Sequence, residues 1–85
     1  MFIFWSRNDD GEATEVGRIW IQDGVIQASG SERVLAIAKE PIETTFGDEV
    51  DPVGDPEAFL DAILMRYHGT YFFATEVPDE TPTQV

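Results

Sequence analysis

The dipeptide Asp23-Gly24, within "VGRIWIQDGVIQAS", constrains the fold of this chain more than any other feature. It joins two β-prone runs, and Asp-Gly is typical of the two-residue type I′ turn, in which both central residues have positive φ. Because a two-residue turn fixes the register, Gln22 should face Val25, and each pair further from the turn follows in step. The sequence therefore predicts an antiparallel hairpin within residues 16–29.

Side chains alternate between the two faces of a strand, so this register divides the hairpin into an apolar face and a mixed face. The apolar face, which we expect to contact the core, holds Ile19, Ile21, Ile26 and Ala28. The opposite face holds Arg18, Trp20, Gln22, Val25 and Gln27. A tryptophan and a valine are thus predicted on the side of the hairpin that points away from the core.

A helix is predicted after the hairpin, in "SGSERVLAIAKEP". Ser29 with Glu32 fits a capping box, and Ser31 is a competing N-cap. Pro41 disfavours a helical conformation at the preceding residue, so the helix should end near Glu40.

The second predicted helix begins at Asp55, a good N-cap, followed by Pro56 at the first helical position. Gly69 is the expected left-handed residue after the helix. His68, the chain's only histidine, would then be a cation at the negative end of the helix dipole.

Aromatic and β-branched residues predict one strand at each end of the chain, at residues 2–5 and 71–77, with a brief edge strand at 42–46. We therefore expect an α+β fold, in which a small, mainly antiparallel sheet (N-terminal strand, Asp-Gly hairpin, C-terminal strand) has two helices packed on one face. Residues 1–77 should form a single domain, and the polar, proline-containing segment 78–85 a disordered tail.

Composition excludes several function classes. The 85 residues include no cysteine, which rules out disulfides, zinc–thiolate sites and a thiol nucleophile. Seventeen acidic and five basic residues give a formal net charge of −12, which repels nucleic acid and anionic membranes. No apolar run is long enough to span a bilayer, and the start does not resemble a signal peptide. We expect a cytoplasmic protein, located in the host cytoplasm or a virion if phage-encoded.

The acidic residues are concentrated between Lys39 and Arg66, a stretch that contains no base. A calcium loop counted from Asp51 fails, because Val53 and Ala62 stand where oxygen ligands are required. Neither a metal nor a cofactor is therefore predicted. Two readings stay open: the acids only keep the protein soluble, or they mimic nucleic acid and occupy a basic groove. The acidic surface is defined by Glu43, Asp48, Glu49, Asp51, Asp55, Glu57 and Asp61.

A catalytic role for His68 is not expected. Asp61 lies seven helical positions earlier, about 10 Å away along the axis, too far to orient the imidazole. The candidate serine nucleophiles lack any nucleophile motif around them. We predict no catalytic residues and no enzyme activity.

Aromatic residues in excess of what a small core can cover suggest a contact surface, since tryptophan, tyrosine and arginine are enriched at interface hot spots. The predicted partner-binding residues are Trp5, Arg18, Trp20, Val25, Tyr71 and Phe73. The sequence thus predicts a protein–protein interaction module, whose partner is a protein with a basic surface or a second copy of the chain. The alternative is a DNA-mimic inhibitor.

The segments "GRIWIQDGVIQAS", "KEPI" and "DPEAFLDAILMRYHGTYFFATEV" together resemble short uncharacterised proteins of bacterial and phage-type gene clusters. Tyr67, Gly69, Tyr71 and Ala74 carry the resemblance, as an aromatic–glycine–aromatic pattern followed by alanine. No named family follows from it. The resemblance implies an accessory or virion-associated protein rather than a metabolic enzyme.

Overall fold

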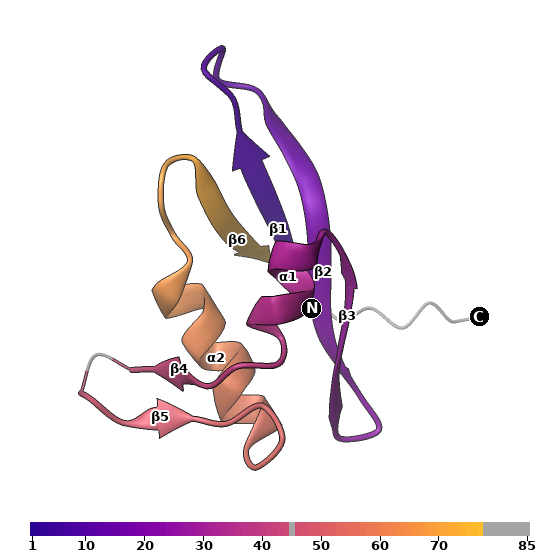
Figure 1. Ribbon diagram of the computed structural model, residues 1–85, viewed down its shortest axis with the longest axis vertical. Helices are drawn as coiled ribbons and strands as arrows, with labels where there is room; N and C mark the ends of the chain where they lie inside the picture. The colour runs from indigo at the N-terminus through magenta and orange to yellow at the C-terminus, as the bar shows by residue number, and fades with distance from the viewer. Residues whose placement is uncertain (45, 78–85) are drawn as a thin grey trace.

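One of the two central strands of the main sheet comes from the N-terminus and pairs with a neighbour on each side (Figure 1). The computed structural model describes residues 1–44 and 46–77, and the predicted tail at 78–85 lies outside them. Its elements, in chain order, are β1 (Phe2–Arg7), β2 (Ala13–Gln22), β3 (Val25–Gly30), α1 (Glu32–Ile37), β4 (Ile42–Glu43), β5 (Glu49–Val50), α2 (Pro56–Arg66) and β6 (Phe72–Glu76).

The β2–β3 hairpin has the predicted turn and register. Asp23 and Gly24 adopt φ values of 54° and 77°, the positive values that a type I′ turn requires. Gln22 pairs with Val25 and Trp20 with Gln27, as the two-residue turn dictates. The local prediction is confirmed residue by residue.

The four long strands form one antiparallel sheet with the order β3-β2-β1-β6, so the two ends of the chain meet in neighbouring strands. The C-terminal strand β6 pairs with the N-terminal strand β1. A β-bulge interrupts the β1–β2 pairing, because Phe4 faces Gly17 while Trp5 faces Glu15. Val16 is therefore the extra residue, and such bulges increase the local twist of a sheet.

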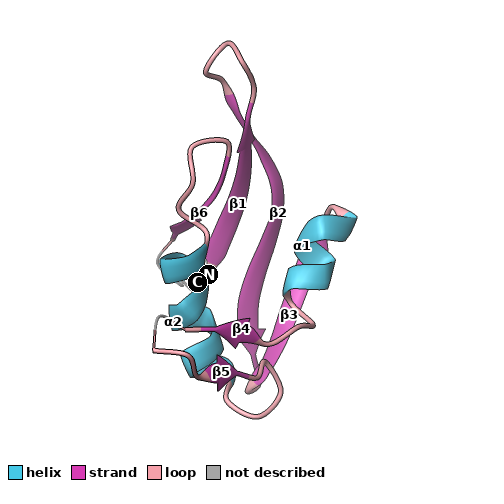
Figure 2. Ribbon diagram, turned by 60° about the vertical axis from the view of Figure 1, so that its left-hand side comes forward, coloured by secondary structure: helices cyan, strands magenta, loops and turns pink. Residues whose placement is uncertain are grey.

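Both helices pack on the same face of this sheet, and the core lies between them and the strands (Figure 2). The fold is thus α+β, with a four-stranded antiparallel sheet, a separate β4–β5 hairpin and two helices. The largest fully buried side chains come from both layers: Phe4, Ile19, Val34, Phe59 and Ile63. Of the four hairpin residues expected in the core, only Ile19 is fully buried, and Ile21, Ile26 and Ala28 are half-buried.

Helix α1 differs from the sequence prediction at both ends. Ser31, the competing candidate, is the N-cap: its hydroxyl accepts a hydrogen bond from the backbone N–H of Val34 at 3.4 Å. Ser29 instead lies in β3, paired with Arg18. The helix ends at Ile37 with Ala38 as its C-cap, so the predicted end near Glu40 is wrong by one turn.

Helix α2 begins as predicted, with Asp55 as the N-cap and Pro56 in the first turn, but it ends differently. Tyr67 is the C-cap, with φ of −108° and ψ of 74°, and Gly69 does not have positive φ. The predicted left-handed Gly69 is therefore wrong. Arg66 is the basic residue in the last turn, and His68 lies just beyond the C-cap, so its predicted place within the last turn of the helix is also wrong.

Tertiary contacts account for this early helix end. The ring of Tyr67 packs in a trio with Phe4 and Phe72, at centroid distances between 5.6 and 5.9 Å. The Tyr67 carbonyl accepts a hydrogen bond from Ala74, and His68 forms an isolated bridge with Phe73. The chain thus leaves the helix to run beside β6, which a local helix signal does not encode.

The predicted edge strand at 42–46 is reduced to β4, two residues long, and its partner β5 was not predicted. Thr44 shapes the connecting turn: its hydroxyl accepts hydrogen bonds from the N–H groups of Phe46 and Asp48, both at 3.3 Å. Ile42 is buried against the core, so this small hairpin is attached to the main body.

Candidate interaction surfaces

One side of the four-stranded sheet carries no helix in residues 1–44 and 46–77 (Figures 1 and 2). Because side chains alternate, every second residue of each strand projects there. We call this side the uncovered face. Its side chains are Ile3, Trp5, Arg7, Ala13, Glu15, Arg18, Trp20, Gln22, Val25, Gln27, Ser29, Phe73 and Thr75.

An aromatic pair lies where β1 meets β6 on the uncovered face. Trp5 stands directly opposite Phe73 in the ladder, and its indole Nε1 donates a hydrogen bond to the Thr75 hydroxyl at 2.9 Å. The guanidinium of Arg7 lies 5.0 Å from the Phe73 ring centroid, within cation–π range. Arg7 also donates to the carbonyls of Thr70 and Gly11, which fixes it in place.

The second tryptophan lies on β2 beside an ion pair. Arg18 donates from two nitrogens to the two carboxylate oxygens of Glu15, the longer bond being 3.0 Å. This hydrogen bonding lowers the pKa of Glu15 and raises that of Arg18. Trp20 donates to Gln22 at 3.4 Å, and a depression of about 310 Å³ is lined by Met1, Arg18, Trp20 and Ser29.

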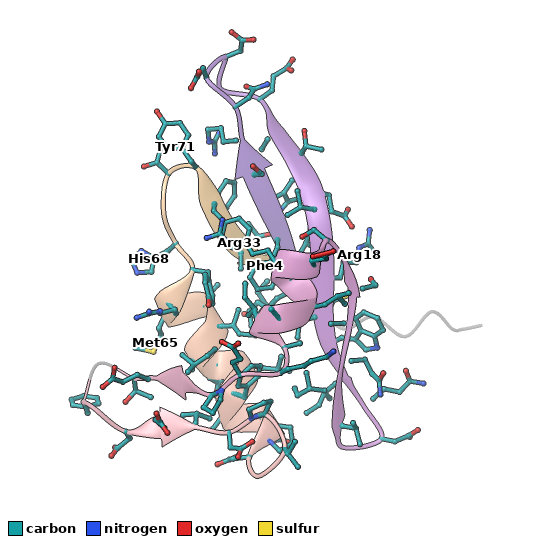
Figure 3. All side chains as sticks on the ribbon, in the orientation of Figure 1. Phe4, Arg18, Arg33, Met65, His68 and Tyr71 are labelled. Atoms are coloured by element: carbon teal, nitrogen blue, oxygen red, sulfur yellow. The ribbon has the colours of Figure 1, made fainter. Side chains whose placement is uncertain are left out.

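Five of the six predicted partner-binding residues lie on the uncovered face, and Tyr71 does not. Tyr71 precedes β6 in a loop, because the strand begins one residue later than predicted (Figure 3). Its side chain is 61% exposed. The predicted partner-binding set left out Arg7 and Thr75. Alternation along the C-terminal strand already places Thr75 on the same face as Phe73, and alternation within "FIFWSR" would have placed Arg7 beside Trp5. Whether these residues bind a partner stays a prediction.

The acidic surface extends over β4, β5, the following loop and the first turns of α2, and all seven side chains are exposed. Glu43 stands opposite Glu49 in the β4–β5 ladder, a like-charge pair that destabilises such a hairpin. Two of the acids have local structural roles. Asp55 caps α2, and an Asp51 carboxylate oxygen accepts from the Val53 N–H at 2.8 Å.

His68 is exposed and points away from the body of the molecule (Figure 3). Asp61 is exposed on α2. Within the part of the chain that the structure describes, no group of three or more histidine, aspartate and glutamate side chains is arranged to hold a metal ion. No described helix is long and apolar enough to cross a membrane.

Comparison with known proteins found no matching family model, no similar curated protein and no similar solved structure.

Proposed function

We propose that this chain is a non-enzymatic protein–protein interaction module that binds a protein partner through its uncovered face. The observation that supports this proposal is the position of both tryptophans of the chain, Trp5 and Trp20, on the side of the sheet without helices. Large aromatic side chains on such a face leave apolar area that a partner can bury. The accessory or virion-associated role implied by the resemblance falls within this proposal.

The charges on the uncovered face favour contact by packing. Arg7 and Arg18 lie there, and Glu15, the strand acid on this face, is paired with Arg18. This face is therefore close to neutral in a chain of net charge −12. A face of aromatic residues and arginine, with few acids, has the composition of an interface core.

The acidic surface has a separate role in this proposal. Its carboxylates generate a negative field that draws a partner with basic regions, which raises the association rate more than the affinity. The partner is thus a protein with a basic surface whose apolar patch docks on Trp5, Phe73 and Trp20. His68 takes no part, so His68→Ala should leave binding unchanged.

The test begins with a partner captured from the native source or encoded by a neighbouring gene, and then purified for binary binding. Phe73→Ala should weaken this complex by tenfold or more, since a hot-spot truncation costs about 2 kcal/mol. Phe46→Ala is the matched control, because Phe46 is 89% exposed at the β4–β5 hairpin, away from the sheet. Equal affinities of the two variants would refute the proposal.

Tryptophan fluorescence provides an independent readout. Because both tryptophans lie on the uncovered face, docking there should shift their emission to shorter wavelength and protect them from acrylamide quenching. A partner that binds without changing either signal docks elsewhere on the molecule.

A DNA-mimic inhibitor remains the alternative, and the Glu43–Glu49 pair favours it. Two carboxylates placed opposite each other cost stability, which a purely structural hairpin would avoid. Mimicry predicts that affinity falls steeply with salt and after Glu43→Gln with Glu49→Gln, whereas Phe73→Ala has little effect. Docking on the uncovered face predicts the opposite ranking. The neutralised variant should fold well, because it removes a repulsion.

A further inference from the structure

Strand β3 is a free edge of the sheet. In the hairpin register, Val25, Gln27 and Ser29 direct their backbone groups toward β2, so those of Ile26 and Ala28 point outward. Within residues 1–44 and 46–77, no loop or side chain forms a hydrogen bond with these outward groups. In Figure 1, β3 lies along the margin of the sheet opposite β6, and α1 lies over the face rather than over this edge.

The two edges of the sheet differ in their protection. On β6, the N–H of Ala74 donates to Tyr67 at 2.8 Å, and His68 bridges to Phe73, so the chain itself covers that edge. Strand β3 has no such cover from the part of the chain that the structure describes, and its sequence "VIQASG" contains no charge and no proline. Natural sheets usually block a free edge with lysine, proline, a bulge or a covering segment. An edge that lacks all of these is suited to pairing.

We propose that β3 pairs with β3 of a second copy, antiparallel across a two-fold axis, so that two four-stranded sheets become one continuous sheet. The outward groups of Ile26 and Ala28 fit this arrangement. When Ile26 of each copy faces Ala28 of the other, both residues can exchange hydrogen bonds, and Gln27 then faces Gln27 of the second copy on the axis. The same side chains remain on the uncovered face in both copies.

Charge favours a second copy over a foreign basic strand at this edge. The acidic surface lies on β4, β5 and α2, whereas β3 is neutral, so two chains of net charge −12 meet at an uncharged strand. A basic partner would instead be drawn to the acidic surface. Apolar area also continues beside β3: a depression of about 270 Å³ includes Val25 and Val53, which are 56% and 89% exposed.

The oligomeric state tests this proposal without any partner and without altering the tryptophans. Sedimentation and light scattering, at concentrations from about 1 to about 300 µM, should show a mass rising to twice the monomer's 9.5 kDa. A monomer over the whole range would overturn it, and the edge would then be open to another chain. Because the test does not use Phe73 or the acidic surface, its failure would leave the proposed function standing.

Two charge variants test the register. Gln27→Lys or Gln27→Glu places like charges opposite each other on the axis, and each alone should raise the dimer dissociation constant about tenfold or more. An equimolar mixture of the two should recover association, because lysine then faces glutamate. Thr14→Lys is the matched control, an exposed position of β2 that pairs with β1 beyond the end of β3. Failure of the mixture to recover, or equal weakening by Thr14→Lys, would contradict the pairing.

Discussion

At the scale of single residues, Gly17 has no room for a side chain although its φ is not positive. A Cβ there would lie 2.7 Å from both the Ser29 carbonyl oxygen and a methyl group of Val34. Helix α1 therefore packs directly on the backbone of β2. We expect Gly17→Ala to lower the free energy of unfolding by about 1–3 kcal/mol, as overpacking does. Urea denaturation measures this change.

Gly54→Ala is the control for this prediction. A Cβ at Gly54 would lie 3.6 Å from the Cβ of Asp51, an ordinary van der Waals contact, and Gly54 does not have positive φ. The free energy of unfolding should change by less than about 0.5 kcal/mol. If Gly17→Ala and Gly54→Ala lower the free energy of unfolding equally, the close approach of α1 to β2 is not the reason for glycine at position 17.

The Glu15–Arg18 pair leads to a pH prediction. The hydrogen bond from Arg18 lowers the pKa of Glu15 below its ordinary value of 4.5 in the folded state. The pair therefore stabilises the fold above that ordinary value, and this contribution is lost as pH falls through the folded-state pKa. The stability difference between wild type and Glu15→Gln should shrink as pH drops below about 4.5.

An NMR titration of the Glu15 carboxyl measures the same effect directly. In Arg18→Gln, the pKa of Glu15 should rise toward its ordinary value, because the main cause of its lowering is removed. An unchanged pKa in this variant would show that Arg18 does not hold the carboxylate in solution.

At the scale of elements, local signals predicted the starts of elements better than their ends. The Asp-Gly turn and the Asp55 N-cap are satisfied by neighbours in sequence, so the sequence alone determines them. The end of α2 depends on Tyr67 packing against Phe4, which lies more than sixty positions earlier in the chain. The β4–β5 pairing is only two residues long and has too weak a pattern to be recognised.

The two candidate caps of α1 give a prediction at this scale. Ser31→Ala should lower the free energy of unfolding by about 1 kcal/mol, because it removes the acceptor for the Val34 N–H. Ser29→Ala, the same chemical change two residues earlier in an exposed strand position, should have almost no effect. Thermal denaturation followed by circular dichroism compares them. A larger loss in Ser29→Ala would reinstate the capping box at Ser29.

At the scale of the whole molecule, the fold class followed from the order of elements, but the strand order did not. Antiparallel strands can be arranged in several orders, and only the packing of the N-terminal strand between β2 and β6 selects one. The aromatic side of the hairpin was predicted because alternation is local. That this side of the hairpin forms one face with Trp5 and Phe73 depends on the register between β1 and β6, which no local sequence signal contains.

The net charge of −12 gives the last prediction, at the scale of the whole chain. Self-repulsion among exposed carboxylates opposes compaction, and salt screens it, so the melting temperature should rise between about 10 and about 150 mM NaCl. Glu43→Lys and Asp9→Lys each reduce the net charge from −12 to −10, and both should weaken this rise equally. Glu43→Lys should add about 0.2–1 kcal/mol of stability, since it converts the pair with Glu49 into an attractive one.

Asp9 lies in the exposed turn between β1 and β2, far from the β4–β5 ladder, so its variant isolates the effect of total charge. Calorimetry at several salt concentrations separates the two contributions, because the local pair is screened less than the long-range field. A melting temperature independent of salt would mean that the carboxylates are too far apart to repel. Equal stabilisation by both variants would mean that the Glu43–Glu49 pair carries no local cost, and the argument for mimicry from that pair would lose its basis.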